Sequence, residues 1–217
     1  MGARQSLGLF VSPLNTSTGL GIVTISFAMA VAQFVWGVAQ PIAGAVADRY
    51  GPARVLAGGL IVLAIGSALT PFMRSGVGLV FAIGILSAVG AGGASFSVLI
   101  GAVSQHVPAN KRGTASGVIN AGGSFGQFVF APLLQKLISL FGWAGAMWSL
   151  AVITLTALPL TWLLRRSPDA TAAHAASTPD GGLRRAVRDA LHDRRYLLLH
   201  AGYFTCGFHS AFLVSHL

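Results

Sequence analysis

Six long stretches without a charged residue decide which solvent this chain can fold in. Each is long enough to cross the hydrocarbon core of a bilayer as a helix, which takes about 20 residues. Apolar residues make up 54% of the chain and charged residues 9%, a balance that no water-soluble core of this size requires. The sequence therefore predicts an all-α integral membrane protein. The stretches cover residues 5–47, 55–73, 75–105, 113–135, 137–164 and 196–217.

Turn-forming residues set the expected ends of the helices. A polar cluster with proline and glycine at residues 12–19 predicts a helix end or a turn. Only about a dozen residues precede this cluster, too few to span a bilayer, so we expect the first helix to be incomplete. Complete helices are predicted near residues 21–47, 55–73, 77–104, 114–138, 143–164 and 196–217.

Basic residues lie between the apolar stretches. A nucleic-acid-binding protein gathers such residues on a soluble face, so we expect no nucleic acid partner despite the net charge of +9. Most of them fall in alternate connections, which predicts that these connections are cytoplasmic. We expect a multi-pass protein of the inner (plasma) membrane, and the preference for arginine over lysine favours a bacterial source. The basic residues of these connections are Arg49, Arg54, Lys111, Arg112, Arg165, Arg166, Arg184, Arg185, Arg188, Arg194 and Arg195.

Composition also divides the chain into three parts. Residues 1–166 contain the first helices, and residues 167–195 form a cytoplasmic linker that is rich in Ala, Ser, Thr, Pro and Asp at its start. Residues 196–217 form a further transmembrane helix. Within the linker, residues 183–191 place apolar side chains on one helical face, which fits a basic amphipathic helix on the inner membrane surface. A solvated connector without lipid contact is the alternative.

One motif follows the second helix, at Gly44-Ala45-Val46-Ala47-Asp48-Arg49-Tyr50-Gly51-Pro52-Ala53-Arg54. It resembles the loop signature of the major facilitator superfamily, in which Gly-x-x-x-Asp-Arg-x-Gly is followed by basic residues. Gly44 would permit close helix approach and Gly51 the turn. The resemblance implies that Asp48 and Arg49 gate alternating access, with Gly44, Gly51 and Arg54 in the same signature. A plain hairpin with topogenic arginines explains the arginines, but not the acid together with both glycines.

The family resemblance covers essentially the whole chain. The loop at residues 108–117 resembles the family's connection between helices 4 and 5, and its position fits the inverted three-plus-three repeat of such transporters. The resemblance implies a six-helix bundle followed by a seventh helix that begins a missing C-terminal half. That missing half, the lipid bilayer and a small anionic substrate are the expected partners, with a proton or a counter-substrate as the coupled species.

The first residues resemble one branch of the family. Arg4 and the residues that follow it to Phe10, together with Pro13, resemble helix 1 of the monocarboxylate and oxalate/formate porters. In that branch a buried cation would attract a carboxylate through charge-assisted hydrogen bonds. Arg4 is therefore a candidate substrate ligand. The alternative is that Met1 is the true start and Arg4 is a solvated terminal charge.

Further candidate ligands lie in the apolar stretches, where polar groups are costly. Tyr203 and His209 lie in a seventh helix that resembles the same branch, although a membrane histidine also serves as a hydrogen bonder between helices. Asn120 and Gln127, seven residues apart, share one helical face. We expect these four residues to face the substrate pathway.

The sequence gives no reason to expect an enzyme. It contains no glutamate, its aspartates lie outside the apolar stretches, and we expect neither catalytic residues, a metal site nor a cofactor. The predicted function is secondary transport of a small organic anion such as a monocarboxylate by alternating access. Efflux of drugs or other solutes is an alternative, weakened because Ala131-Pro132-Leu133-Leu134 matches only the proline of the drug-antiporter ending of helix 5. The second alternative is a membrane protein that does not transport but acts as a partner or regulatory protein.

Overall fold

The computed structural model describes residues 6–164 and 188–216 of the chain. It divides the chain into two compact units, residues 1–171 and 172–217. In the described ranges all regular structure is helical, so the all-α prediction is confirmed. Each unit is considered by itself. The second contains α11 (Arg194–His216).

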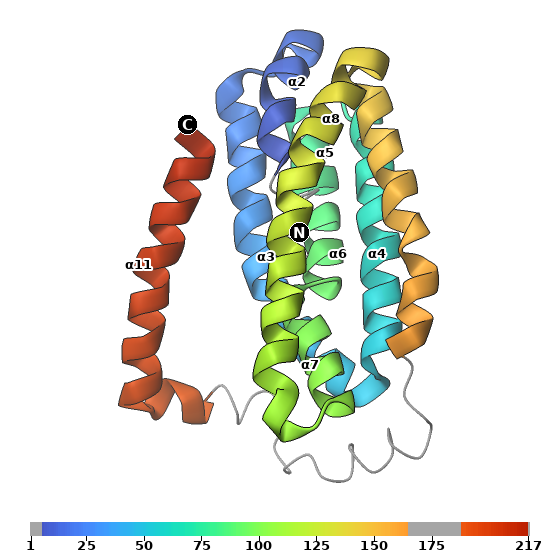
Figure 1. The fold of residues 1–217 in the computed structure, drawn as a ribbon. Helices are drawn as coiled ribbons and strands as arrows, with labels where there is room; N and C mark the ends of the chain where they lie inside the picture. The colour runs from blue at the N-terminus through green and yellow to red at the C-terminus, as the bar shows by residue number, and fades with distance from the viewer. Residues whose placement is uncertain (1–5, 165–187, 217) are drawn as a thin grey trace. The chain divides into compact units, whose positions relative to one another are not determined.

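The first unit is an up-and-down bundle of long helices (Figure 1). The chain enters it through a short 3₁₀ turn and a short helix, and then crosses it repeatedly. The elements are η1 (Ser6–Phe10), α2 (Val11–Thr18), α3 (Ile22–Tyr50), α4 (Pro52–Leu69), η2 (Thr70–Phe72), α5 (Gly76–Leu79), η3 (Val80–Ser87), α6 (Ala88–Gly93), α7 (Phe96–His106), η4 (Ala109–Lys111), α8 (Arg112–Thr156) and η5 (Leu158–Leu164).

The element α8 holds two of the predicted helices. At about 1.5 Å per residue, its 45 residues would be roughly twice as long as the hydrocarbon core is thick. Gly142 breaks the helix with φ 69° and ψ 175°, a conformation that favours glycine. Figure 1 shows the chain turning back at the end of the bundle there. The two predicted helices at 114–138 and 143–164 are therefore present as separate crossings.

The helix predicted at residues 77–104 is interrupted, so its continuity was a wrong prediction. The segment η3 is π-helical, and the hydroxyl of Ser87 donates to the carbonyl of Ala82, five residues back, at 2.9 Å. Beyond α6, Ala94 and Ser95 leave the helical conformation, with ψ of 29° and 161°. Glycine is a poor helix former, and the glycine-rich segment just before the break, Gly90 to Gly93, gives the helix little resistance to it.

The predicted cytoplasmic connections lie at one end of the bundle. The α3–α4 turn, the α7–α8 connection and the end of η5 are together at the lower end in Figure 1. The turns around Gly19, Arg74 and Gly142 are at the opposite end. The charge count along the sequence thus separates the two ends of the bundle correctly.

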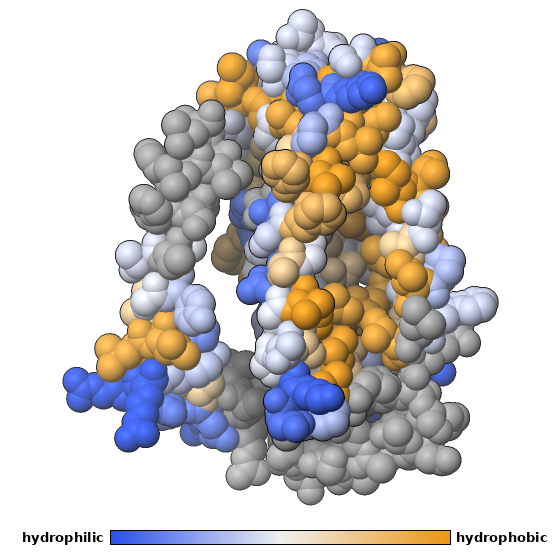
Figure 2. Space-filling model, in the orientation of Figure 1, coloured by the Kyte–Doolittle hydropathy of each residue, from blue (hydrophilic) through white to orange (hydrophobic). Residues whose placement is uncertain are grey.

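Apolar side chains cover both the inside and the outside of this unit. The inside is a core to which η1, α2, α3, η3 and α8 contribute buried residues such as Phe10, Leu14 and Leu134. The outside carries Phe34 at 74% and Phe128 at 77% exposure, and Figure 2 shows orange apolar surface along the helices. Four described stretches are long and apolar enough to cross a membrane: Ile22–Tyr50, Pro52–Phe72, Gly76–Val103, which includes the break, and Arg112–Thr161. A surface of this kind requires lipid as its solvent.

Glycines allow α4 to pack closely against the interrupted helix. A Cβ at Gly59 would lie 2.5 Å from the amide nitrogen of Ala94, and one at Gly90 would overlap the backbone of Leu63. A Cβ at Gly66 would overlap Ser87. Small residues permit such backbone approach where lipid gives helices no hydrophobic drive to associate. The glycines at these positions therefore bring the two helix backbones close together.

Neighbouring glycines of α4 provide a test of this contact. We expect Gly59→Ala to lower the free energy of unfolding by about 1–3 kcal/mol, because its Cβ would meet backbone atoms that cannot move aside alone. Gly58→Ala, at a position with nothing within 4 Å, should leave it unchanged or raise it slightly. Thermal unfolding of the purified chain in detergent measures both. Equal effects of the two substitutions would contradict the close packing.

An indole hydrogen bond ties the second half of α8 to the end of α4. Pro71 has no N–H, so the carbonyl of Ala68 lacks its donor three residues on in the 3₁₀ turn of η2. The Nε1–H of Trp148 donates to this carbonyl at 3.2 Å, and the ring of Trp148 lies 6.1 Å from that of Phe72. The tryptophan thus satisfies a backbone group that the proline leaves open.

Replacing Trp148 separates the hydrogen bond from the ring contact. Trp148→Phe keeps an aromatic ring but removes the donor, and we expect it to lower stability by about 1 kcal/mol. Phe72→Leu removes the ring contact and leaves the hydrogen bond, so it should have the smaller effect. Unfolding of both variants by heat in the same detergent makes the comparison. A larger loss in Phe72→Leu would show that ring packing dominates.

Candidate functional site

The signature motif forms the sharp turn between α3 and α4. The helix α3 ends at Tyr50, and the amide of Gly51 donates to the carbonyl of Ala47 at 2.9 Å. Gly51 has φ 90° and ψ 140°, a backbone conformation that side chains rarely adopt. Pro52 then starts α4 at the position where a missing N–H costs nothing. The role expected for Gly51 as the turn residue agrees with this geometry.

The charged residues of the signature are all at the surface. Asp48, Arg49 and Arg54 are exposed, and the guanidinium carbon of Arg49 lies 5.6 Å from the ring centroid of Tyr50. Gly44 is different from the expectation, since a Cβ there would meet nothing within 4 Å. Its role in close helix approach is not realised within this unit. This corner therefore carries exposed charges beside a glycine with open space around it.

The other predicted ligands fall into separate places. Asn120 and Gln127 are both exposed on α8, so their shared helical face is an open one. Arg4 lies outside the described residues. Tyr203 is 70% exposed on α11 in the second unit, and His209 is in the same helix, with its side chain outside the described set.

A polar pair that the sequence analysis missed joins α3 and α7. The hydroxyl of Ser97 donates to Oε1 of Gln40 at 3.1 Å. Gln33, Gln40 and Asp48 lie within about 80° of arc on α3, so one face of this helix carries its polar side chains. The signal that could have revealed Gln33 and Gln40 is their cost inside an apolar stretch, as for Asn120.

Amide and hydroxyl side chains lie on three helices of the first unit, α3, α7 and α8. The helix α7 packs against both α3 and α8, so it connects the helix of Gln40 to the helix of Asn120. The side chains present there are amides and hydroxyls, which can donate hydrogen bonds to an anion without the desolvation cost of a buried charge. We call Gln33, Gln40, Ser97, Asn120 and Gln127 the polar surface.

The break before α7 holds a buried hydroxyl without a partner. Ser95 is 2% exposed, and among the described residues its Oγ has no hydrogen-bond partner. It occupies the N-cap position of α7, yet it accepts no hydrogen bond from the first turn of that helix. A buried polar group of this kind is costly in lipid.

Removing the hydroxyl of Ser95 tests whether it only destabilises the fold. We expect Ser95→Ala to raise the free energy of unfolding by about 1 kcal/mol, because the unpaired group disappears. Thr154→Ala is the comparison, since that buried hydroxyl donates to the carbonyl of Leu150 at 2.8 Å and should not stabilise when removed. Thermal unfolding in detergent measures both. A loss of stability in Ser95→Ala would reveal a partner for the hydroxyl.

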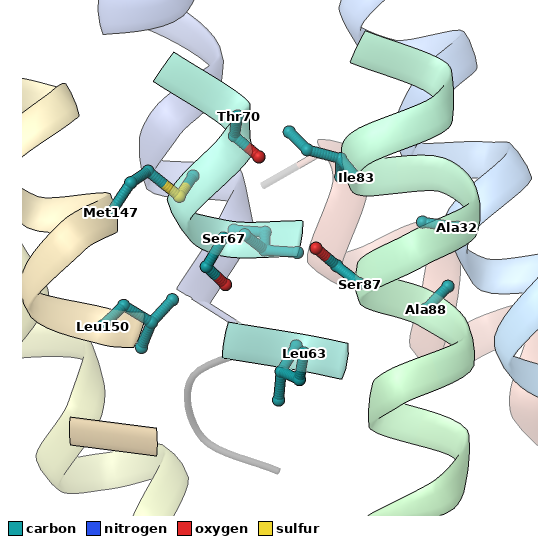
Figure 3. A pocket seen from close by; sticks show the side chains of 10 residues that line it. Ala32, Leu63, Ser67, Thr70, Ile83, Ser87, Ala88, Met147 and Leu150 are labelled. Carbon is teal, nitrogen blue, oxygen red and sulfur yellow. The ribbon is translucent and has the colours of Figure 1, made fainter. Parts of the chain in front are cut away.

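A small internal cavity lies apart from the polar surface. It has a volume of about 20 Å³, room for about one water molecule, and lies where α4, η3 and α8 meet (Figure 3). Ser67 and Ser87 line it together with apolar side chains such as Leu63 and Leu150. None of the predicted site residues in the described ranges lines it. The cavity is too small for an organic anion and is not the candidate site.

Comparison with known proteins decides the family. The sequence model of the Major Facilitator Superfamily matches residues 1–217. The chain belongs to the major facilitator superfamily. The resemblance drawn from Asp48, Arg49 and their neighbouring glycines is thereby confirmed. Membership of this family, together with the long apolar helices, shows that the chain is a multi-pass membrane protein.

Several curated members of the superfamily are similar to this chain. Monocarboxylate transporter 11 of Mus musculus is 30% identical over 165 residues, which is 76% of this chain and 36% of that protein. The oxalate:formate antiporter of Oxalobacter formigenes is 27% identical over 65% of this chain and 33% of its own length. The probable sulfoacetate transporter SauU of Cupriavidus necator is 29% identical over 74% and 33%. The expected branch of the family is thus confirmed. These relatives are transporters, which supports the prediction that the chain is a transporter and not an enzyme.

Proposed function

We propose that this chain is the N-terminal half of a secondary transporter that carries a small organic anion, such as a monocarboxylate, by alternating access. The chain spans about a third of the length of the curated relatives it matches, 36% for the mouse protein. The remaining half of the pathway therefore comes from a C-terminal half. Transport of the anion is coupled to a proton or to a counter-substrate. The protein resides in the plasma membrane of a bacterium.

The names of the relatives support the proposed class of substrate. Monocarboxylates, oxalate, formate and sulfoacetate are all small organic anions. The polar surface fits such a substrate because its amide and hydroxyl groups can donate hydrogen bonds to carboxylate oxygens. In this proposal Asn120 and Gln127 contact the anion from α8, and Arg4 supplies the balancing positive charge. Tyr203 and His209 contribute from the seventh helix.

The signature turn supplies the gate. Asp48 and Arg49 are exposed at the end of α3, where they can form ion pairs with the C-terminal half in one state of the cycle and release them in the other. Exposed ion pairs of this kind are worth little individually, which suits a contact that must break in every cycle. The open position at Gly44 leaves room for the approaching helix.

Transport by the complete protein tests the substrate and its ligands together. We expect uptake of labelled oxalate, formate or lactate into proteoliposomes, and we expect Asn120→Ala and Gln127→Ala to lower it severalfold by removing donors to the carboxylate. Gln135→Ala is the matched control, because it removes an exposed amide further along α8 without touching the proposed site. Arg4→Gln should abolish carboxylate uptake.

Other outcomes would lead to other functions. Uptake that is unchanged in Arg4→Gln would remove Arg4 from the site. Resistance to drugs that disappears when the gene is deleted, without any anion uptake, would favour efflux. A stable complex of this chain with another membrane protein, and no transport by either, would favour a regulatory partner.

A further inference from the structure

A short helical segment precedes α11 in the second unit. Residues 188–192 are helical, and Figure 1 shows this segment turning away from the axis of α11. The ring of His192 lies 2.8 Å, through Nδ1, from the carbonyl of Arg188, and the amide of Asp193 donates to the carbonyls of Asp189 and Ala190. The segment thus has a closed end of its own before α11 begins.

Hydrogen bonds to Asp193 also fix the start of α11, on the other side of the bend. Oδ1 of Asp193 accepts from the amide of Arg195 at 2.9 Å, and the carbonyl of Asp193 accepts from the amide of Leu197 at 3.0 Å. This is the N-cap arrangement that starts a helix. The bend between the two helices is therefore built into the sequence at Asp193.

Three arginines are exposed around this bend. Arg188, Arg194 and Arg195 are all exposed, and we call them the basic surface. In the described part of this unit no ion pair joins them to Asp189 or Asp193 within 4.0 Å, and the Asp193 carboxylate is engaged by the helix cap. The guanidinium groups are therefore available to an external anion. Figure 2 shows this blue surface at the base of the unit.

Apolar and aromatic residues follow the arginines immediately along α11. The rings of Tyr196 and His200 stack with centroids 4.2 Å apart. Leu197, Leu198 and Leu199 are exposed on successive faces of the helix, Leu198 by 65%, and need lipid to cover them. The arginines come first, then Tyr196 and then three leucines, which is the order of a helix that enters a bilayer from the headgroup side.

We propose that the basic surface binds the headgroups of anionic phospholipids in the inner leaflet, with the short helix at residues 188–192 lying along the membrane surface. Leu191, which is 58% exposed, then turns toward the acyl chains. Two arguments favour lipid over an acidic protein: the basic surface joins directly to α11, which the proposed function places in the bilayer, and guanidinium groups match phosphate. The proposal goes beyond transport and rests on the membrane-spanning role of α11 in the proposed function.

Lipid selectivity of the complete 217-residue chain tests this proposal. The purified protein is placed in bilayers of phosphatidylcholine and phosphatidylglycerol in equal amounts, and the lipids retained after gentle extraction are counted by native mass spectrometry. We expect the wild type to retain phosphatidylglycerol preferentially. Replacing Arg188, Arg194 and Arg195 by Gln should reduce this preference roughly a hundredfold, since three basic residues near the surface contribute about 1 kcal/mol each.

Equal charge removal elsewhere is the matched control. Arg54, Lys111 and Arg112 are also exposed, at the predicted cytoplasmic end of the first unit. Their joint replacement by Gln should leave most of the preference in place. A loss as large as that in the test variant, or an unchanged preference in the test variant, would overturn the proposal. Circular dichroism verifies that both variants stay helical.

Two further measurements separate the alternatives. Replacing the arginines of the basic surface by lysine should keep most of the lipid preference, whereas a variant that failed only through misfolding would not be rescued. If inorganic phosphate displaces the lipid completely, or an acidic protein binds the basic surface more tightly than vesicles do, the lipid assignment is wrong.

The membrane position of α11 is checked separately. With Cys206 changed to Ser, a fluorescent label at Leu198→Cys should be quenched by lipid-borne quenchers. A label in water would overturn the membrane-spanning role of α11, and with it the basis of this proposal. A label in lipid without any preference for phosphatidylglycerol would overturn the lipid proposal alone.

Discussion

Lipid gives the helices of this protein no hydrophobic reason to associate, and most of its architecture follows from that. A leucine gains little by leaving acyl chains for the protein interior, so contacts must come from close backbone packing and from hydrogen bonds. The α4 glycines at positions 59 and 66 meet Gly90 and Ser87 of the interrupted helix at distances that any Cβ would prevent. The indole of Trp148 adds a hydrogen bond to a carbonyl that Pro71 leaves open. These contacts hold the first unit together.

The same glycines explain why one helix is interrupted. A sequence that lets the backbone approach a neighbour also resists unwinding least, and the break at Ala94 and Ser95 follows directly after Gly92 and Gly93. The segments on either side are anchored differently. On one side α6 packs against both α3 and α4, while on the other α7 reaches α8. A rearrangement at the break would move Ser97, and with it the bond to Gln40, and it would also disturb the contact of Gly59 with Ala94.

The sequence predicted the elements better than their continuity or their surfaces. Charge-free length was enough to find the long apolar helices of the first unit, because the bilayer fixes how long a spanning helix must be. The break at Ser95 was missed because apolar length carries no information on backbone geometry. Gly51 was recognised because a turn with positive φ accepts little else, whereas the close approach expected at Gly44 finds no partner among the described residues, since spacing cannot show which neighbour is present. Gln40 was missed although its cost in lipid was visible in the sequence.

The distribution of charge connects the two units functionally. The α3–α4 turn carries Asp48 followed by Arg49 and Arg54, and the start of α11 carries Asp193 followed by Arg194 and Arg195. In the second case the carboxylate is used by the helix cap, which leaves the arginines to the membrane. In the first, Gly51 and Pro52 form the turn through the backbone, and the exposed side chains of Asp48 and Arg49 lie beside it. The exposed position of Asp48 suits a gate, whereas the carboxylate of Asp193 is held by the cap of its own helix.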